Sequence, residues 1–317
     1  MPVSNYPNGF MNGVAIRGVP VQQLYPGEVF WVNGSSVVTK GGVGGSNSNP
    51  GTYQKPFATI DYAIGRCTAS RGDVIVVMPG HSETVATDGG IACDVAGIAI
   101  IGLGTGSLRP KVVLDTLAAA AVTVSAANVT IQNIVFEASF ADVTNAIDVT
   151  AANFSLINCE FSEEGANLNF LDYIHCSSTT DNNADGLRVE GCIGTAVDTA
   201  QNSFVNIKAD MDKFVFKDNV YSSEHTNTLA MVLCATGKDL TDCVVTGNIM
   251  NAPQKASGDM LIDNDTTVNT GVVAHNLVGH GDTETEILID ADGVRVFENY
   301  GTAVTTASGY ILPAVDS

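Results

Sequence analysis

The feature that most constrains the fold is a short phrase that recurs along the chain. Two alternating hydrophobic residues are followed by a polar spacer and then by Asn, Gly or Cys, as in Val129–Ile134 and Phe154–Cys159. These two copies also open alike, with Ala-Ala-Asn at 126–128 and 151–153, 25 positions apart. A second short hydrophobic phrase precedes the first in most copies. Each unit therefore holds at least two short strands with alternating side chains.

A period of roughly 20–30 residues with strands and no helix is typical of a β-solenoid. One such unit cannot bury its apolar face alone, whereas stacked units share a continuous core with rungs about 4.8 Å apart. From residue 74 onward the sequence accommodates roughly eight rungs, which predicts a rod about 35–40 Å long.

The last position of the phrase forms a column, because equivalent positions of a solenoid stack above one another. A column of Asn can hydrogen-bond amide to amide and also serve a tight turn. Where such partners are missing, a small apolar residue fits instead. We interpret this column as structural rather than catalytic; its members are Ile134, Cys159, Cys192, Asn219, Asn248, Asn276 and Asn299.

Composition supports a chain that buries much of its length. Hydrophobic residues make up 45% of the 317 residues and charged residues only 15%, which argues against general disorder. The net charge of −20 argues against nucleic-acid or anionic-membrane partners, since either would repel the chain. No apolar run reaches transmembrane length, and the N-terminus has no signal-peptide pattern. The seven cysteines, an odd number, favour reduced thiols and synthesis in a cytosol.

The first 30 residues have no regular period but carry isolated large apolar side chains. A flexible tail is one interpretation; we favour an extended arm that docks on a partner or a sister subunit. A Gly- and Ser-rich linker follows at 41–50. The candidate docking anchors are Tyr6, Phe10, Met11, Ile16, Leu24, Tyr25, Phe30 and Trp31.

A short amphipathic helix is predicted at about 56–67. Phe57, Ile60, Ile64 and Cys67 fall on one face at helical spacing, and Pro56 suits the first turn. A strand follows at once, so this helix would cover the open end of the first rung, which would otherwise be an exposed sheet edge.

This helix and the strand after it carry a resemblance to a known family. The run from 49 through Pro56–Ile60 to the Gly-Asp-strand-Pro-Gly segment at 72–80 resembles the entry of pectate-lyase-like right-handed parallel β-helix proteins. The whole sequence, arm included, looks like the β-helix structural proteins of tailed bacteriophages. The resemblance implies a virion surface protein, often trimeric, that decorates the capsid or forms a spike.

Three motifs are better explained by the fold than by chemistry. Gly102–Gly106 lacks the helix N-terminus that a phosphate loop needs, because Arg109, Pro110 and another strand follow. The Arg-Gly-Asp tripeptide at 71–73 is interpreted as the turn into the first strand. The histidines at 81, 175, 225, 275 and 280 show no metal or nucleophile spacing, and we assign them no role; His275 is expected to be an outward strand residue.

The best enzymatic candidate is a pair of carboxylates. Asp263 and Asp290 end equivalent strands 27 residues apart, so their side chains are expected about 5 Å apart on one face. That separation suits a retaining glycosidase or a bound cation. The alternative interpretation, which we prefer, is a pair of solvated turn acids, because Trp31 is the only tryptophan and few arginines are present to bind a sugar or to serve a pectate-type lyase.

The sequence thus predicts an all-β protein, a right-handed parallel β-helix at 49–300 with the capping helix, an arm and linker at 1–48 and a tail at 301–317. The expected function is non-enzymatic: a capsid decoration (cement) protein on a bacteriophage virion, made in the host cytoplasm, held by its arm to the major capsid protein or other virion proteins. It is expected to be a homo-oligomer, with a homotrimer implied by the resemblance, and to need no cofactor or metal. The alternatives are a tail-spike or tail-fibre protein that binds or cleaves host polysaccharide, and a secreted bacterial polysaccharide lyase.

Overall fold

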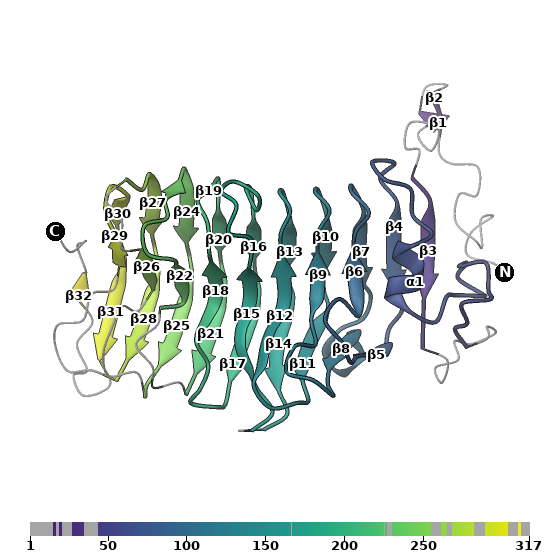
Figure 1. Cartoon of the computed structure of the whole chain (residues 1–317), viewed down its shortest axis with the longest axis horizontal. Coiled ribbons are helices and arrows are strands. Elements are labelled where there is room, and N and C mark those ends of the chain that lie inside the picture. Colours follow the sequence, from purple (N-terminus) through teal and green to yellow (C-terminus); the bar gives the residue numbers. More distant parts are fainter. Residues whose placement is uncertain are drawn as a thin grey trace.

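The computed structural model describes most of the repeat region and little of either terminus. The described residues are 15–16, 19–20, 27–34, 44–165, 167–224, 226, 230–254, 261–264, 268–281, 289–303 and 310–311. Successive coils lie side by side along one axis, as Figure 1 shows, and β3 and β31 lie at opposite ends of the rod. The predicted parallel β-helix is therefore confirmed. Its right-handed sense of winding stays a prediction.

Three parallel sheets run along the rod, and each complete coil contributes one strand to each of them; the coil that begins with β3 contributes to sheet 1 only. In stacking order, sheet 1 contains β3 (Val29–Val32), β4 (Val74–Val77), β7 (Ala99–Gly102), β10 (Thr130–Gln132), β13 (Ser155–Ile157), β16 (Arg188–Glu190), β20 (Val215–Lys217), β24 (Cys243–Thr246), β27 (Gly271–Ala274) and β30 (Arg295–Phe297). Sheet 2 contains β5 (Ser82–Val85), β8 (Lys111–Leu114), β11 (Val135–Ala138), β14 (Glu160–Glu163), β17 (Ile193–Ala196), β21 (Val220–Ser223), β25 (Ile249–Ala252), β28 (Leu277–His280), β31 (Tyr300–Ala303) and the antiparallel β32 (Tyr310–Ile311). Sheet 3 contains β6 (Ile91–Cys93), β9 (Val122–Val124), β12 (Val143–Val149), β15 (Phe170–Cys176), β18 (Ser203–Ile207), β22 (Val232–Cys234), β26 (Ile262–Asn264) and β29 (Ile289–Ala291).

Two short ladders lie outside these sheets. β1 (Ala15–Ile16) pairs antiparallel with β2 (Val19–Pro20), and β19 (Met211–Asp212) pairs parallel with β23 (Leu240–Thr241). A 3-10 turn, η2 (Gly106–Leu108), occupies the glycine-rich segment that was compared with a phosphate loop. That segment is thus a corner between β7 and β8.

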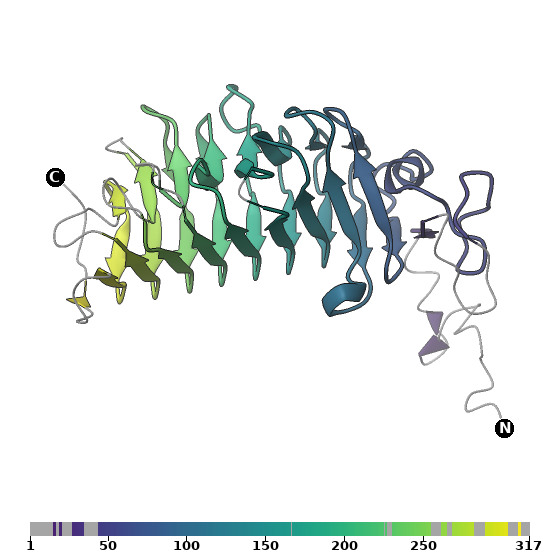
Figure 2. The same ribbon diagram turned by 90° about the horizontal axis from the view of Figure 1, so that it is seen from below.

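Register in the sheets places like residues above one another, which is what the repeat requires. In sheet 1 an inward aliphatic and aromatic column passes without interruption from coil to coil. Figure 2, seen from below, shows the coils stacked in chain order. The members of the column are Ile75, Ile100, Ile131, Leu156, Val189, Phe216, Val245, Val273 and Val296.

Aromatic rings fill the middle of the rod. Tyr173 stacks on Phe161 at 4.6 Å between ring centroids and meets Phe204 edge-on at 5.1 Å. The facing position on β17 is Gly194, where a Cβ atom would lie 2.3 Å from Cε2 of Tyr173. Only glycine fits there, because the two rings already occupy the space that a side chain would take.

The N-terminal end of the rod is closed by α1 (Ile60–Ile64), which is shorter than the predicted helix at 56–67. Thr59 caps it, and Ile60 and Ile64 are buried against the first coils. Its Asp61 carboxylate accepts the N–H of Ala92 on the edge strand β6 at 3.1 Å. The helix thus satisfies part of an edge that would otherwise be open.

Residues 56–58 do not join the helix because the backbone of Phe57 is used elsewhere. Its N–H donates to the carbonyl of Trp31 at 2.8 Å, and its carbonyl accepts the N–H of Asn33 at 2.9 Å. Phe57 is therefore held in an extended bridge beside β3.

Trp31 and Phe30, two of the candidate docking anchors, lie in β3, which pairs with β4. Phe30 packs against the core and lies 5.8 Å from Phe57 between ring centroids, and Trp31 lies 5.1 Å from Tyr53. These two side chains belong to the first turn of the rod, so the boundary drawn at residue 48 does not separate an arm from the β-helix. The boundary at 300 likewise falls within β31.

A polar ladder occupies one inner corner of the later coils. The side-chain N–H of Asn219, Asn248 and Asn276 each donates to Oδ1 of the next asparagine at 2.8–3.1 Å, the last acceptor being Asn299. The backbone N–H of the same three residues donates to the same oxygens at 2.9–3.0 Å. Each amide, Asn299 included, also donates to a carbonyl of the preceding coil at 2.9–3.1 Å.

The same corner of the earlier coils is occupied by thiols. Cys192 donates its N–H to Oδ1 of Asn219 at 2.9 Å, and its Sγ lies 3.6 Å from the carbonyl of Leu156. Cys159 points its Sγ at the carbonyl of Ile131 at 3.9 Å. All seven cysteines are free thiols.

The residue before each corner position adopts a left-handed backbone conformation, which turns the chain from sheet 1 to sheet 2. His275, expected as an outward strand residue, belongs to this set: it has φ 57° and its ring lies against Phe297. His275 is exposed, as expected of an outward residue, but it lies at the turn that follows β27 rather than in a strand, because β27 ends at Ala274. The set comprises Asn133, Asn158, Gly191, Asp218, Gly247, His275 and Glu298.

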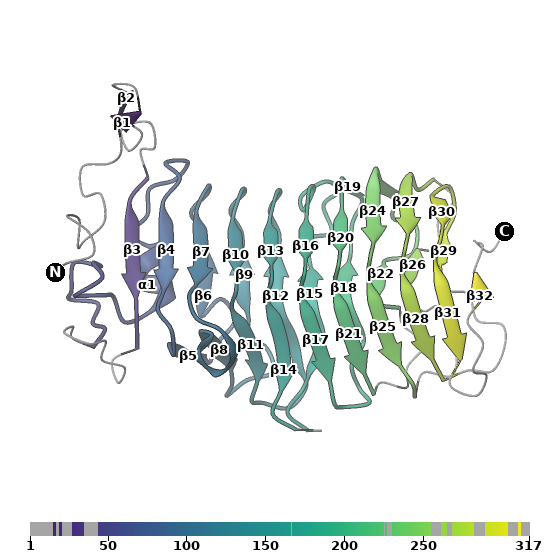
Figure 3. The same cartoon turned by 180° about the vertical axis from the view of Figure 1, so that it is seen from behind.

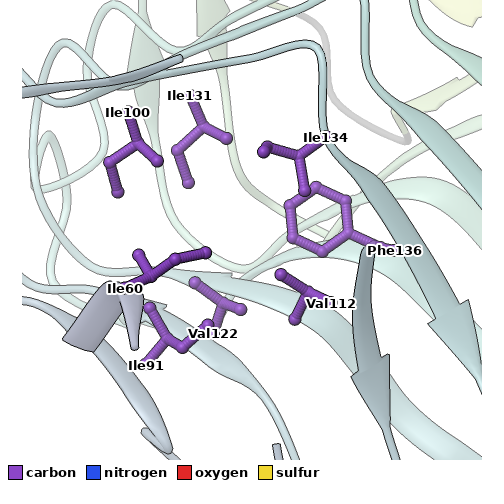
Figure 4. Close-up of a pocket in the computed structure, with 8 residues that line it drawn as sticks. All are labelled: Ile60, Ile91, Ile100, Val112, Val122, Ile131, Ile134 and Phe136. Carbon is purple, nitrogen blue, oxygen red and sulfur yellow. The ribbon is translucent and has the colours of Figure 1, made fainter. Parts of the chain in front are cut away.

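The core beneath α1 contains a small apolar cavity. Figure 4 shows Ile60 from the helix facing Ile91, Val122 and Ile131 from the first coils around a cavity of about 10 Å³. Such a space is too small to hold more than about one water molecule, and its lining is apolar. In the described part of the chain, no helix has the length and hydrophobicity needed to cross a bilayer.

Candidate functional site

A polar cluster lies on sheet 3 where β12, β15 and β18 run side by side. Register places Asn145, Asp172 and Ser203 in one row across these strands. The cluster also includes His175, which pairs in register with Asp148 on one side and with Asn206 on the other. Six polar side chains from three coils are thereby brought together, which we call the sheet 3 cluster.

Asp172 is the centre of the sheet 3 cluster and is only 4% exposed. One carboxylate oxygen accepts the hydroxyl of Ser203 at 2.7 Å and its N–H at 3.2 Å. The other oxygen accepts a side-chain N–H of Asn206 at 2.9 Å. Donors on both oxygens offset the cost of burying this group.

Three buried polar atoms around Asp172 have no hydrogen-bond partner among the described residues. They are Nδ2 of Asn145, Nε2 of His175 and Oδ1 of Asn206. Asn145 is 8% exposed and Asn206 is 6% exposed. An unpaired buried donor or acceptor costs about 1–3 kcal/mol, so three of them in one place require an account.

The electrostatics of the sheet 3 cluster favour a neutral imidazole. Burial lowers the pKa of His175; the negative charges of Asp172 and Asp148 oppose this shift, and Lys208 adds to it. Asp148 is held by the hydroxyl and N–H of Ser177, at 2.8 and 3.3 Å. A neutral imidazole between two carboxylates can act as a proton donor or acceptor near neutral pH.

Chemically, the unpaired atoms form a donor, an acceptor and an imidazole nitrogen that can be either. A water molecule or a hydroxyl group, each of which donates and accepts, can pair with any one of these atoms. Because the atoms are enclosed, a ligand larger than water reaches them only if the chain around them opens.

Glu163, at the end of β14, is a second unusual acid. It accepts the N–H of Phe170 at 3.2 Å, and those of Val197 and Asp198 at 2.7 and 3.3 Å. Burial raises its pKa to about 7, although these three donors act in the opposite direction. The side chain joins the segments that follow β14 and β17, so it is a structural tie that titrates near neutral pH.

The carboxylate pair expected to be the best enzymatic candidate is paired by the backbone. Asp263 in β26 lies opposite Asp290 in β29 in the parallel register. Their side chains lie outside the described residues, so the expected 5 Å separation stays a prediction. Among the described residues, no group of three or more His, Cys, Asp or Glu side chains is placed to hold a metal ion.

The predicted docking anchors divide between described and undescribed parts of the chain. Ile16 lies in β1, where only the backbone is described. The remaining anchors lie outside the described residues: Tyr6, Phe10, Met11, Leu24 and Tyr25.

The Arg-Gly-Asp tripeptide is an internal structural element. Asp73 is fully buried and accepts two N–H groups of Arg71 at 2.7 and 2.8 Å. It also accepts the backbone N–H of Glu28 and Thr68, both at 2.7 Å. Burial acts to raise the pKa of Asp73, and these four donors lower it further than burial raises it. The carboxylate fastens β3 to the turn before β4.

Sequence reasoning missed the sheet 3 cluster. His175 was given no role, and Asp172 was not among the candidate residues. The available signal was a polar residue at strand positions where neighbouring coils carry apolar ones, such as Leu233 in register with Asn206. Recognising it required knowing which positions of adjacent coils stack.

Comparisons with known proteins do not show a family for this chain. No protein-family model matches the sequence, and no curated protein does. One similar solved structure is described as "Rhamnogalacturonan lyase"; it has a TM-score of 0.45 and 14% sequence identity, and the match covers 80% of this chain and 70% of that chain.

Proposed function

We propose that this protein is a non-enzymatic structural component of a bacteriophage virion, a capsid decoration (cement) protein fastened through its N-terminal arm to the major capsid protein or another virion protein. The observation that carries the proposal is the construction of the rod. Its core is continuous, its corners are hydrogen-bonded from coil to coil, and its first coil is closed by β3 and α1. A fold in which every coil is tied to its neighbours opens slowly, which suits a particle that persists outside cells.

The arm is the second support. The chain before β3 contains the other six candidate docking anchors, whereas Phe30 and Trp31 pack within the rod itself. The anchors proposed for docking are therefore Tyr6, Phe10, Met11, Ile16, Leu24 and Tyr25.

The test is a truncation placed by the structure. Removal of residues 1–26 leaves β3, α1 and every coil, so the truncated protein should remain folded with unchanged circular dichroism. We expect it to lose co-sedimentation with phage particles that carry the full-length protein. A matched control, Leu117→Glu in the full chain, alters an exposed side chain of the rod and should still bind. Particle binding by the truncated protein would contradict the arm as anchor.

A second candidate function, recognition or cleavage of a host surface polysaccharide, is supported by the sheet 3 cluster. Any of its unpaired atoms can hydrogen-bond a sugar hydroxyl once the chain around them opens, and His175 then serves as the proton donor or acceptor beside Asp172. The double change Asp172→Asn and His175→Gln should abolish sugar release from purified host polysaccharide while the wild-type protein shows it. Asp263→Asn with Asp290→Asn is the matched comparison, because it tests the other carboxylate pair. A wild-type protein that neither binds nor cleaves the polysaccharide would exclude this candidate.

A further inference from the structure

An exposed apolar column runs along sheet 2 over five consecutive coils. The register of β17, β21, β25, β28 and β31 places one large apolar side chain of each coil directly above the last. Figure 3 shows these strands side by side toward the C-terminal end of the rod. We call this set the sheet 2 column; its members are Ile193, Val220, Ile249, Leu277 and Tyr300.

Each member of the sheet 2 column is 38–48% exposed, although the alternate residues of the same strands are buried. Over the last three coils the surface forms a hollow of about 320 Å³ between Ile249, Leu277 and Tyr300. Isolated exposed apolar residues are ordinary on protein surfaces. A row of five about 20 Å long is a contiguous patch, and such patches mark interaction surfaces.

The same column of sheet 2 is mixed in the earlier coils, where Ser82, Lys111, Val135 and Glu160 occupy the equivalent positions. Val135 is buried there, and Lys111 and Glu160 form ion pairs with Glu137 and Arg109. The apolar side chains of the later coils are therefore not imposed by the strand position itself.

The distribution of charge favours a second copy of this chain as the partner of the sheet 2 column. The whole chain carries −20, so two copies repel one another wherever acidic surfaces meet. The sheet 2 column has no charged member, and the next outward positions on the same strands are also uncharged: Thr195, Ser222, Asn251 and Gly279. A second copy can approach this face with little electrostatic cost.

The spacing of the apolar side chains also favours a second copy of the rod as the partner. The column offers one apolar side chain per coil, about 4.8 Å apart, and another copy of the rod carries the same repeat. We propose that copies of this chain associate side by side through the sheet 2 column, each contributing its own row of five apolar residues. This inference does not depend on a virion role, since it concerns only how the rod meets itself.

The experiment is sedimentation-velocity and equilibrium analysis of the full chain. The wild type should sediment at a multiple of 32.9 kDa, and added salt should strengthen association by screening the acidic surfaces. The double variant Ile249→Glu with Leu277→Glu should sediment at 32.9 kDa, with a dissociation constant raised at least about 100-fold, as expected when charges replace central apolar contacts. The matched control, Leu108→Glu with Leu117→Glu, adds the same charge at exposed residues away from the column and should associate as the wild type does.

Two further variants guard the result against misfolding and indirect effects. Ile249→Thr with Leu277→Thr keeps strand-forming residues and should also weaken association. Ile249→Cys should form a covalent dimer under mild oxidation, whereas Leu117→Cys, which lies away from the column, should not. Native thiols should interfere little, because six of the seven are buried. A wild type that is monomeric at high concentration and high salt, or a column variant that associates unchanged, would overturn the proposal.

Discussion

The inner corner of the rod is filled in two different ways in its two halves. In the later coils Asn248 and its neighbours form a continuous amide ladder, whereas in the earlier coils Cys159 and Cys192 occupy the same position. The geometry of the two is alike: the thiol of Cys192 and the amide of Asn219 each point to a carbonyl of the preceding coil. The strength of the hydrogen bonds differs, because a thiol is a weak donor and has no oxygen to accept the backbone N–H of the corner residue in the preceding coil.

The largest effect is expected from breaking the ladder in its middle. Asn248→Ala removes two donated and two accepted hydrogen bonds at a fully buried site. The backbone N–H and side-chain amide of Asn219 and the carbonyl of Phe216 lose partners. We expect the free energy of unfolding to fall by about 3–5 kcal/mol, because several buried groups lose a partner at about 1–3 kcal/mol each.

Chemical denaturation of Asn248→Ala and of Cys192→Ala provides the comparison. Cys192→Ala removes a small apolar group with one weak donor, so we expect a loss of only about 1–2 kcal/mol. Equal losses for the two variants would mean that the corner is stabilised by packing alone and that the amide ladder adds nothing.

Glu163 extends the comparison from neutral to ionisable acceptors. It receives three backbone N–H groups, as the ladder asparagines receive theirs, but it can take up a proton. Its pKa is raised to about 7 from an ordinary value near 4.5, chiefly by burial. The folded state therefore binds this proton more tightly than the unfolded state does. Its contribution to stability is fully present below about pH 4.5 and is lost as the pH rises through 7.

The corresponding measurement is the pH dependence of unfolding of the wild type and of Glu163→Gln. Between about pH 5 and pH 8 the wild type should lose about 1–3 kcal/mol more than the variant, allowing for partial solvent exposure. The ladder variant Asn248→Ala should retain the wild-type slope, since no ladder group titrates. Parallel pH profiles for wild type and Glu163→Gln would show that Glu163 is not coupled to folding.

Much of this architecture could be predicted from the sequence, and the exceptions have a common cause. The 25-residue repeat and the asparagines at 219, 248, 276 and 299 indicate stacked coils, because such a pattern can be recognised along the chain without knowing which residues of different coils are in contact. The contacts of Asp172, His175 and Asn206 depend on which residues of three coils share a row, and the loops between coils vary in length. The docking role assigned to Phe30 and Trp31 overlooked β3, because residues 33–73 separate that strand from its partner β4.

The smallest expected effect is also the sharpest test of the comparison. Cys192→Asn places an amide at the boundary between the two kinds of corner. Its new N–H would face the carbonyl of Leu156 and Oδ1 of Asn219, both already contacted by Cys192. If the ladder is limited only by residue type, stability should rise by up to about 1 kcal/mol, the net value of a well-formed hydrogen bond. The reciprocal change, Asn219→Cys, should be destabilising by more, because it removes the acceptor for the N–H of Cys192. A loss in both directions would instead show that the earlier coils are packed too closely to admit an amide.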